Sequence, residues 1–166
     1  MNALLYWMVW LSLIAFAAGE LAKSRRYAGA WSISATGAIL LAVHIVLAMA
    51  VRHGWSHALA VEATARQTSD VFGLNWGGGV YVNYVFAVVW IAELFVWRQW
   101  PEGYALRPLW IKWSLRVFYA VIIVSAAVIF AIGWRRWMGA AILAGLAISW
   151  IARFQRPTAP ASERPR

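Results

Sequence analysis

The chain has 166 residues, of which 63% are hydrophobic and 13% charged, and it carries a formal net charge of +9 at pH 7. Soluble domains hold about 45–50% apolar and about 25% charged residues, so this composition excludes an ordinary water-soluble domain. The absence of cysteine excludes disulfides, thiolate metal sites and iron–sulfur clusters. No motif of a nucleic-acid-binding fold accompanies the positive charge, so we expect no nucleic-acid partner.

Long apolar stretches fill most of the chain, and there are five of them: Ala3–Gly19, Ala30–Val51, Gly79–Trp97, Leu115–Gly133 and Trp137–Ala152. Crossing the hydrocarbon core takes about 20 apolar residues, a length that the first and last stretches do not reach. The stretches are apolar on every face, whereas barrel strands alternate, and backbone groups in lipid then require helices. We predict an all-α integral membrane protein, a compact bundle of five transmembrane helices. Four spans plus one interfacial helix are the alternative.

The first two stretches differ in what they indicate. The first lacks the basic residues that open a signal peptide, and its apolar run is longer than usual for one, so we expect a retained helix. The second has small residues at four-residue spacing, which allow helices to approach closely in lipid. We predict a helix contact face made of Ala30, Ser34, Ala38 and Ala42.

Residues 52–84 form the longest connection on their side of the membrane. From about Ser56 to Gln67 the sequence favours a short amphipathic helix, supported by Glu62 and Arg66 at i,i+4 spacing. Four glycines after Asp70 indicate tight turns. We predict that this connection is a recognition surface.

Aromatic and polar residues in and beside this connection are typical of a small-ligand pocket. A histidine inside a span, such as His44, normally faces the bundle interior or a cavity. We predict a pocket facing outward, with His57 at its edge. Its candidate residues are His44, Asn75, Trp76, Tyr81, Asn83 and Tyr84.

His53 and His57 would share a face if their segment were helical, and they could then bind a metal ion together with Glu62 or Asp70. The pair lacks the glutamate of a zinc-protease motif, and Gly54 lies between the two histidines. A haem held between two spans would need ligands from facing helices, whereas all three histidines come from one helix and its extension. We therefore expect no cofactor, and zinc or haem remains the alternative.

The third and fourth stretches carry the charged residues that lie closest to the lipid core. Asn83, Trp90 and Glu93 follow at spacings of seven and three, which places Asn83 and Trp90 on one helix face. Glu93 lies toward the cytoplasmic end, where Arg116 begins the fourth span. We predict a buried ion pair between Glu93 and Arg116, with a proton or cation site as the functional alternative.

The fifth stretch has a second run of small residues, Ala141, Gly145 and Ser149, which we also expect to be a contact face. Residues 1–153 are predicted to form a single transmembrane domain. Residues 154–166 are basic and rich in proline, so we expect a disordered cytoplasmic tail.

The basic residues predict the orientation, because Lys and Arg near span ends favour the cytoplasm. Eleven of them fall on one side if the N-terminus is outside and the C-terminus inside: Lys23, Arg25, Arg26, Arg98, Arg107, Lys112, Arg116, Arg153, Arg156, Arg164 and Arg166. The other side has four: Arg52, Arg66, Arg135 and Arg136. Thirteen tryptophans fit belts at both interfaces. The predominance of arginine over lysine favours a bacterial inner membrane.

Three functions are compatible with this sequence. The first is a non-enzymatic accessory, assembly or small-ligand-binding protein that contacts anionic headgroups at its cytoplasmic face and assembles with itself or a membrane partner. The second is a membrane enzyme or redox subunit with metal or haem near His44, His53 and His57. The third is a small proton-coupled transporter that uses His44 and Glu93. Because no catalytic motif is present, we expect the first.

Overall fold

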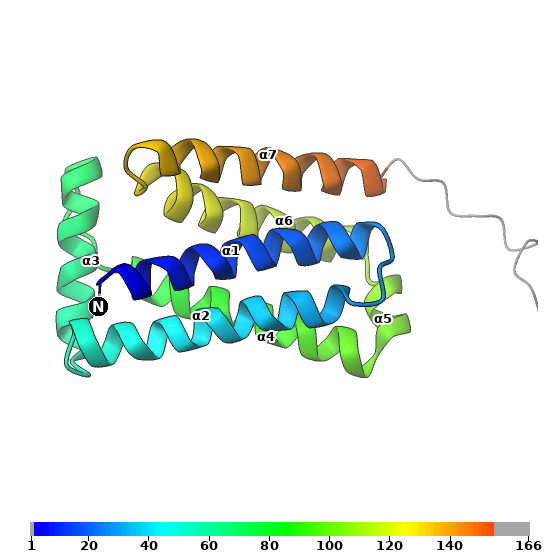
Figure 1. Ribbon diagram of the computed structural model, residues 1–166, viewed down its shortest axis with the longest axis horizontal. Helices are drawn as coiled ribbons and strands as arrows, with labels where there is room; N and C mark the ends of the chain where they lie inside the picture. The colour runs from blue at the N-terminus through cyan, green and yellow to red at the C-terminus, as the bar shows by residue number, and fades with distance from the viewer. Residues whose placement is uncertain (1, 155–166) are drawn as a thin grey trace, which may run out of the picture.

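The computed structural model describes residues 2–154, and over that range the ordered elements are all helical. Five long helices lie side by side (Figure 1), namely α1 (Asn2–Ser24), α2 (Ala30–Arg52), α4 (Gly79–Gln99), α6 (Leu109–Val124) and α7 (Trp134–Phe154). A π-helical segment, η1 (Ser125–Ile129), continues α6. The predicted tail from residue 155 onward lies outside the described residues.

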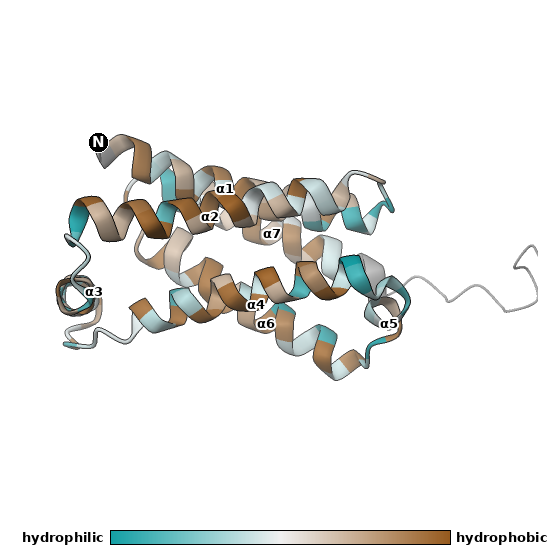
Figure 2. Cartoon of the chain, turned by 90° about the horizontal axis from the view of Figure 1, so that it is seen from below, coloured by the Kyte–Doolittle hydropathy of each residue, from teal (hydrophilic) through white to brown (hydrophobic). Residues whose placement is uncertain are grey.

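Two shorter helices lie at opposite ends of the bundle. Helix α3 (His57–Phe72) runs across one end, perpendicular to the long helices, and α5 (Pro101–Leu106) lies at the other end (Figure 1). Strongly hydrophilic residues concentrate at these two ends (Figure 2). The bundle is therefore apolar along its length and polar at its tips, as a membrane requires.

Within residues 2–154, four helices are long and apolar enough to cross a membrane: Ala3–Ser24, Ala30–Arg52, Gly79–Gln99 and Leu109–Ile129. Helix α7 has the same length as α4 and packs against α1 and α6. Its apolar run between Arg136 and Arg153 is shorter than the about 20 residues that span the hydrocarbon core. Helix α7 therefore has the length of its neighbours, but its uninterrupted apolar segment is shorter than theirs.

The fourth predicted span, residues 115–133, corresponds to α6 together with η1. These two elements begin at Leu109 and end at Ile129, earlier than predicted. Pro101 is the first residue of α5, and Pro108 is the N-cap of α6. Proline is suited to a helix start because its fixed φ and missing N–H cost nothing there. The two prolines thus mark the starts of the short helix α5 and the spanning helix α6. The sequence alone predicts a connection without helices at these positions.

Helix α3 has a defined start and a defined end. The Ser56 side chain accepts a hydrogen bond from the Leu59 backbone N–H, which caps the first turn. Gly73 ends the helix in the left-handed conformation at φ 69°. A Cβ on Gly77 would lie 2.5 Å from the Val61 carbonyl oxygen, so only glycine lets the next connection pack against α3.

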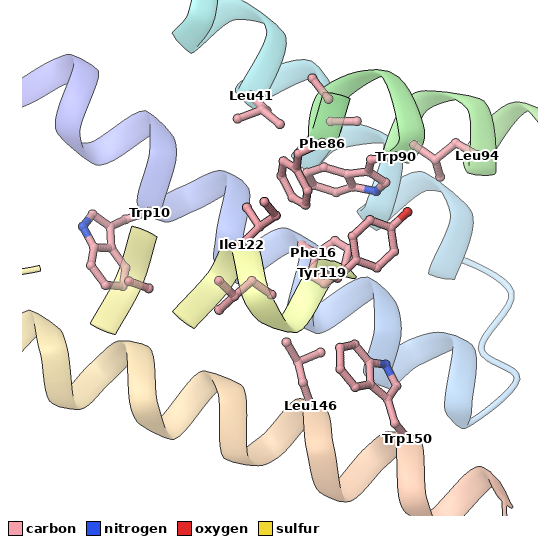
Figure 3. Packing of buried hydrophobic residues seen from close by; sticks show 14 of the residues in the cluster. Trp10, Phe16, Leu41, Phe86, Trp90, Leu94, Tyr119, Ile122, Leu146 and Trp150 are labelled. Carbon is pink, nitrogen blue, oxygen red and sulfur yellow. The ribbon is translucent and has the colours of Figure 1, made fainter. Parts of the chain in front are cut away.

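The core combines small residues between α1 and α2 with large aromatics elsewhere. Ala30, Ser34 and Ala38 are buried on α2, where the small-residue stripe was predicted. Between the helices, Phe16, Phe86, Trp90 and Tyr119 gather, while Leu146 and Trp150 reach them from α7 (Figure 3).

Candidate functional site

A cavity of about 690 Å³ lies inside the bundle near α3. Its wall comes from the first part of α1, from α3, from the first half of α4, and from the end of α6 with η1. These parts lie toward the α3 end of the bundle (Figure 1), and Leu41 of α2 completes the wall. The lining residues are Tyr6, Val9, Trp10, Ser12, Leu13, Phe16, Leu41, Thr64, Gln67, Thr68, Phe72, Leu74, Trp76, Gly79, Val82, Asn83, Phe86, Trp90, Val121, Ile122, Ile123, Ser125, Ala126, Ala127, Phe130 and Ala131.

The floor of the cavity is buried and mainly aromatic. Phe16 meets the Trp90 ring edge-on, with ring centroids 5.0 Å apart, and Phe86 lies 5.7 Å from Trp90. The Trp90 indole N–H donates to the Ser34 hydroxyl at 3.1 Å, so the one polar group of this ring is satisfied. Aromatic pairs with these geometries favour fixed positions, and the floor is therefore a rigid apolar surface.

The π-helical segment forms one wall of the cavity. The Phe130 backbone N–H donates to the Ser125 carbonyl at 3.0 Å, which is an i to i+5 bond. Three small residues at this bulge, Ser125, Ala126 and Ala127, line the cavity. Single-turn π segments are frequent at functional sites, and here the small side chains leave the cavity its width.

The mouth of the cavity lies where α3, α4 and η1 meet. Gln67, Asn83 and Ala126 line the cavity and are solvent-exposed in the isolated chain, unlike the floor residues. Phe72, at the end of α3, contacts Phe130 edge-on with ring centroids 6.0 Å apart. The cavity therefore runs from an apolar floor to a partly polar mouth beneath α3.

The structure divides the predicted pocket residues into two groups. Trp76 and Asn83 line the cavity. Tyr81 and Tyr84 lie beside His57 instead, with ring centroids 5.2 and 5.9 Å from it, and the Tyr84 hydroxyl donates to the Met49 sulfur at 3.6 Å. Alternate faces of α4 explain the division, because side chains one or two positions apart on a helix point in different directions.

The other two predicted pocket residues do not line the cavity. Asn75 is exposed in the connection that follows α3. His44 lies on α2, and it is not among the residues that line the cavity. The Nδ1 atom of His44 is buried without a partner among the described residues.

The two histidines proposed as metal ligands do not share a helix. His53 is the C-cap of α2, Gly54 and Trp55 both have positive φ, and α3 begins at His57. The i,i+4 spacing therefore spans a turn, and the common helical face that the hypothesis needed is missing. Among residues 2–154 no group of three or more His, Asp or Glu side chains is arranged to hold a metal.

Apart from the cavity, the bundle contains a polar cluster centred on Glu93, which lies at the α5 end. Its carboxylate accepts hydrogen bonds from Tyr104 at 2.5 Å, Arg107 at 2.7 Å and Tyr119 at 2.6 Å. Lys23 is 3.8 Å away. The Glu93 side chain is 12% exposed, and it is held by groups from α1, α5, the following connection and α6.

A second carboxylate extends this cluster to α7. Glu20 pairs with Lys23 at 2.9 Å and accepts a hydrogen bond from the Trp150 indole at 2.8 Å. Two carboxylates thus face two cations, Lys23 and Arg107, and the cluster is close to neutral. When buried charges of opposite sign are also hydrogen-bonded, their attraction offsets the free-energy cost of removing them from water.

The partner predicted for Glu93 was a different arginine. Arg116 lies in the second turn of α6, where it donates to the Trp150 carbonyl at 3.5 Å and its guanidinium lies 5.0 Å from the centre of the Trp113 ring. Arg107 occupies the position beside Glu93, because α5 turns the chain back under the bundle. The prediction thus identified the carboxylate and chose the wrong cation.

Tyr104 belongs to the short helix outside the long bundle helices, and it is buried beside the charged side chains of Glu93 and Arg107. Burial, together with the charge of the neighbouring Glu93, raises the pKa of the Tyr104 phenol. Its ring also lies 3.9 Å from the Arg107 guanidinium and stacks on Trp97. This tyrosine is thus held as a neutral hydrogen-bond donor at the base of the bundle.

Comparisons with protein-family models, with curated proteins and with solved structures find no match to this chain.

Proposed function

We propose that this protein binds a small lipophilic molecule in the cavity beneath α3 and acts without catalysis of its own, as a ligand-binding or accessory protein of the membrane. The observation that carries the proposal is a cavity of about 690 Å³ with a buried aromatic floor and a few polar groups at its mouth. Small-molecule sites are typically apolar, contain few polar groups and measure about 300–1,000 Å³. Residues 52–84, the predicted recognition surface, supply the roof and much of the mouth.

We further propose that α7 is a fifth span, in a bacterial inner membrane with α3 outside and the α5 end in the cytoplasm. The distribution of basic residues supports this orientation. The Lys and Arg residues at the α5 end would attract anionic headgroups. In this arrangement the cavity mouth opens toward the outer leaflet, where a lipophilic ligand is dissolved.

The proposal is tested by filling the cavity and identifying what the protein carries. Val82 lines the cavity, whereas Val88 on the same helix is 66% exposed and does not. Val82→Phe and Val88→Phe therefore add the same atoms inside and outside the cavity. We expect solvent extracts of the purified wild type and Val88→Phe to contain a near-stoichiometric lipophilic compound by mass spectrometry, and Val82→Phe to lose it. Equal extracts from all three proteins would refute the proposal.

A further inference from the structure

The cavity lining carries no charged side chain within the part of the chain that the structure describes. The nearest charges along α3 are Glu62 and Arg66, which pair with each other at 3.0 Å on its exposed face, and Asp70, which is also exposed. Outside the lining, the Arg135 guanidinium lies over the Tyr6 ring, 4.2 Å from its centre. A charged group placed among the lining residues would be desolvated without an opposite charge in the lining itself to compensate, which strongly disfavours its binding. The lining thus selects against anions and cations alike.

Most hydroxyl groups of the lining already donate a hydrogen bond within the protein. Each gives its single proton to a backbone carbonyl, in hydrogen bonds of 2.8 to 3.0 Å. These residues are Ser12, Thr64, Thr68 and Ser125. The amides of Gln67 and Asn83 differ, because neither makes a hydrogen bond within residues 2–154. Each amide offers two donors and one acceptor.

The two amides are close to one contact between α3 and α4. The Thr64 methyl group lies 3.0 Å from where a Cβ on Gly79 would be. Gln67 is about one turn from Thr64 along α3, and Asn83 is about one turn from Gly79 along α4, roughly 5 Å in each case. Both amides therefore flank the same corner of the mouth. Asn83 is also exposed in the first turns of a spanning helix, where an unbonded amide in lipid is costly.

We infer that the ligand is an uncharged amphiphile whose apolar body fills the aromatic floor and whose hydroxyl or carbonyl group is bound by Gln67 and Asn83. This inference rests on the proposed function of the cavity. The polar group of the ligand satisfies both amides, and its body replaces lipid against Phe16, Phe86 and Trp90. A neutral head and an apolar body match the lining from mouth to floor.

The test uses three probes with the same hydrocarbon chain: oleyl alcohol, oleate and oleylamine. Each is added at equal concentration to the detergent-solubilised protein at about pH 9, where the carboxylate and the ammonium are both charged, and 1:1 adducts are counted by native mass spectrometry. We expect oleyl alcohol to bind at least about tenfold more tightly than either charged probe. Gln67→Leu and Asn83→Leu should each weaken oleyl alcohol binding about fivefold, and Val88→Phe should leave it unchanged.

The outcomes separate this inference from the proposed function. If Val82→Phe abolishes the adducts but oleate or oleylamine binds as well as the alcohol, the cavity binds ligands and the inference of a neutral ligand is wrong. Unchanged alcohol binding in both amide variants would equally overturn the assigned head-group contacts. If Val82→Phe binds all three probes as the wild type does, the cavity is not the site and both proposals fail.

Discussion

At the scale of single residues, Glu93 is a nearly buried carboxylate that accepts hydrogen bonds from three side chains. One carboxylate holds two tyrosines and an arginine, each from a different part of the chain. Removing one partner of a buried charge pair is more damaging than replacing both, because the other charge is left unpaired. The cluster therefore links α1, α4, α5 and α6 through one side chain.

The first prediction concerns this charge. Glu93→Gln should lower the free energy of unfolding by about 3 kcal/mol, because it leaves Arg107 and Lys23 facing a neutral group. Arg116→Gln, which removes a cation outside the contacts of Glu93, should cost less than about 1 kcal/mol. Chemical unfolding in detergent measures both. Similar losses in the two variants would restore Arg116 as the partner of Glu93.

The second prediction concerns pH. The raised pKa of Tyr104 means that its contribution to stability is complete below about pH 10, the ordinary pKa of tyrosine. Above that pH the unfolded chain ionises first, so the contribution is lost as pH rises. Between about pH 8 and about pH 11 the melting temperature should fall less in Tyr104→Phe than in the wild type. A parallel decline in the two proteins would contradict the burial of this phenol.

At the scale of elements, hydropathy is enough to locate the long helices, because a lipid-facing helix is apolar on every side. The α2 stripe is also visible in the sequence, since close helix contact requires small residues. The short helix α5 is not, because Pro101 and Pro108 can equally mark a loop. That ambiguity moved the start of α6 by six residues and misdirected the pairing of Glu93 from Arg107 to Arg116.

The stripe expected on α7 as a contact face, in the bundle or with a partner, is buried in the bundle only at Ser149, whereas Ala141 and Gly145 are exposed. Gly145 faces open space, and apart from the neighbouring backbone of α7 itself no atom lies within 4 Å of a Cβ built on it. The close contact on α7 is at Gly139 instead, where a Cβ would overlap the backbone carbonyl of Ala127 at the π-helical segment. Small residues permit close approach, but their spacing alone does not say which of them is used.

The third prediction compares these two glycines. Gly139→Ala should destabilise the protein by about 2 kcal/mol, because α7 must move away from the π-helical segment. Gly145→Ala should leave stability unchanged or raise it by up to about 1 kcal/mol, because alanine favours the helix. Thermal unfolding of both variants provides the comparison. A larger loss at Gly145 would mean that this face of α7 is a contact in a larger assembly.

At the scale of the whole molecule, a membrane bundle can be predicted from the sequence, but the cavity cannot. The cavity depends on where η1 departs from α-helical geometry and on α3 lying across the end of the bundle. Neither the hydropathy of the segments nor the spacing of their residues encodes these features. Only Trp76 and Asn83 among the predicted pocket residues line the cavity, because the prediction combined residues from different faces of α4 with residues of α2 and of the connection after α3.

The fourth prediction concerns topology. With five spans and the proposed orientation, the C-terminus would be cytoplasmic, so a fluorescent protein fused to it should fluoresce and an alkaline phosphatase fused there should be inactive. Active phosphatase at that position would place α7 on the surface and support four spans. A phosphatase inserted at exposed Asn75 should be active with either number of spans, which makes it the positive control.

The position of the floor has a further consequence. Between Trp90 and the α5 end, the bundle is filled by Leu94, Tyr119 and the Glu93 cluster, all buried or nearly so. The cavity is thus closed toward the α5 end by buried side chains. Any passage from the cavity to the α5 end would therefore require the hydrogen bonds of the Glu93 cluster to break.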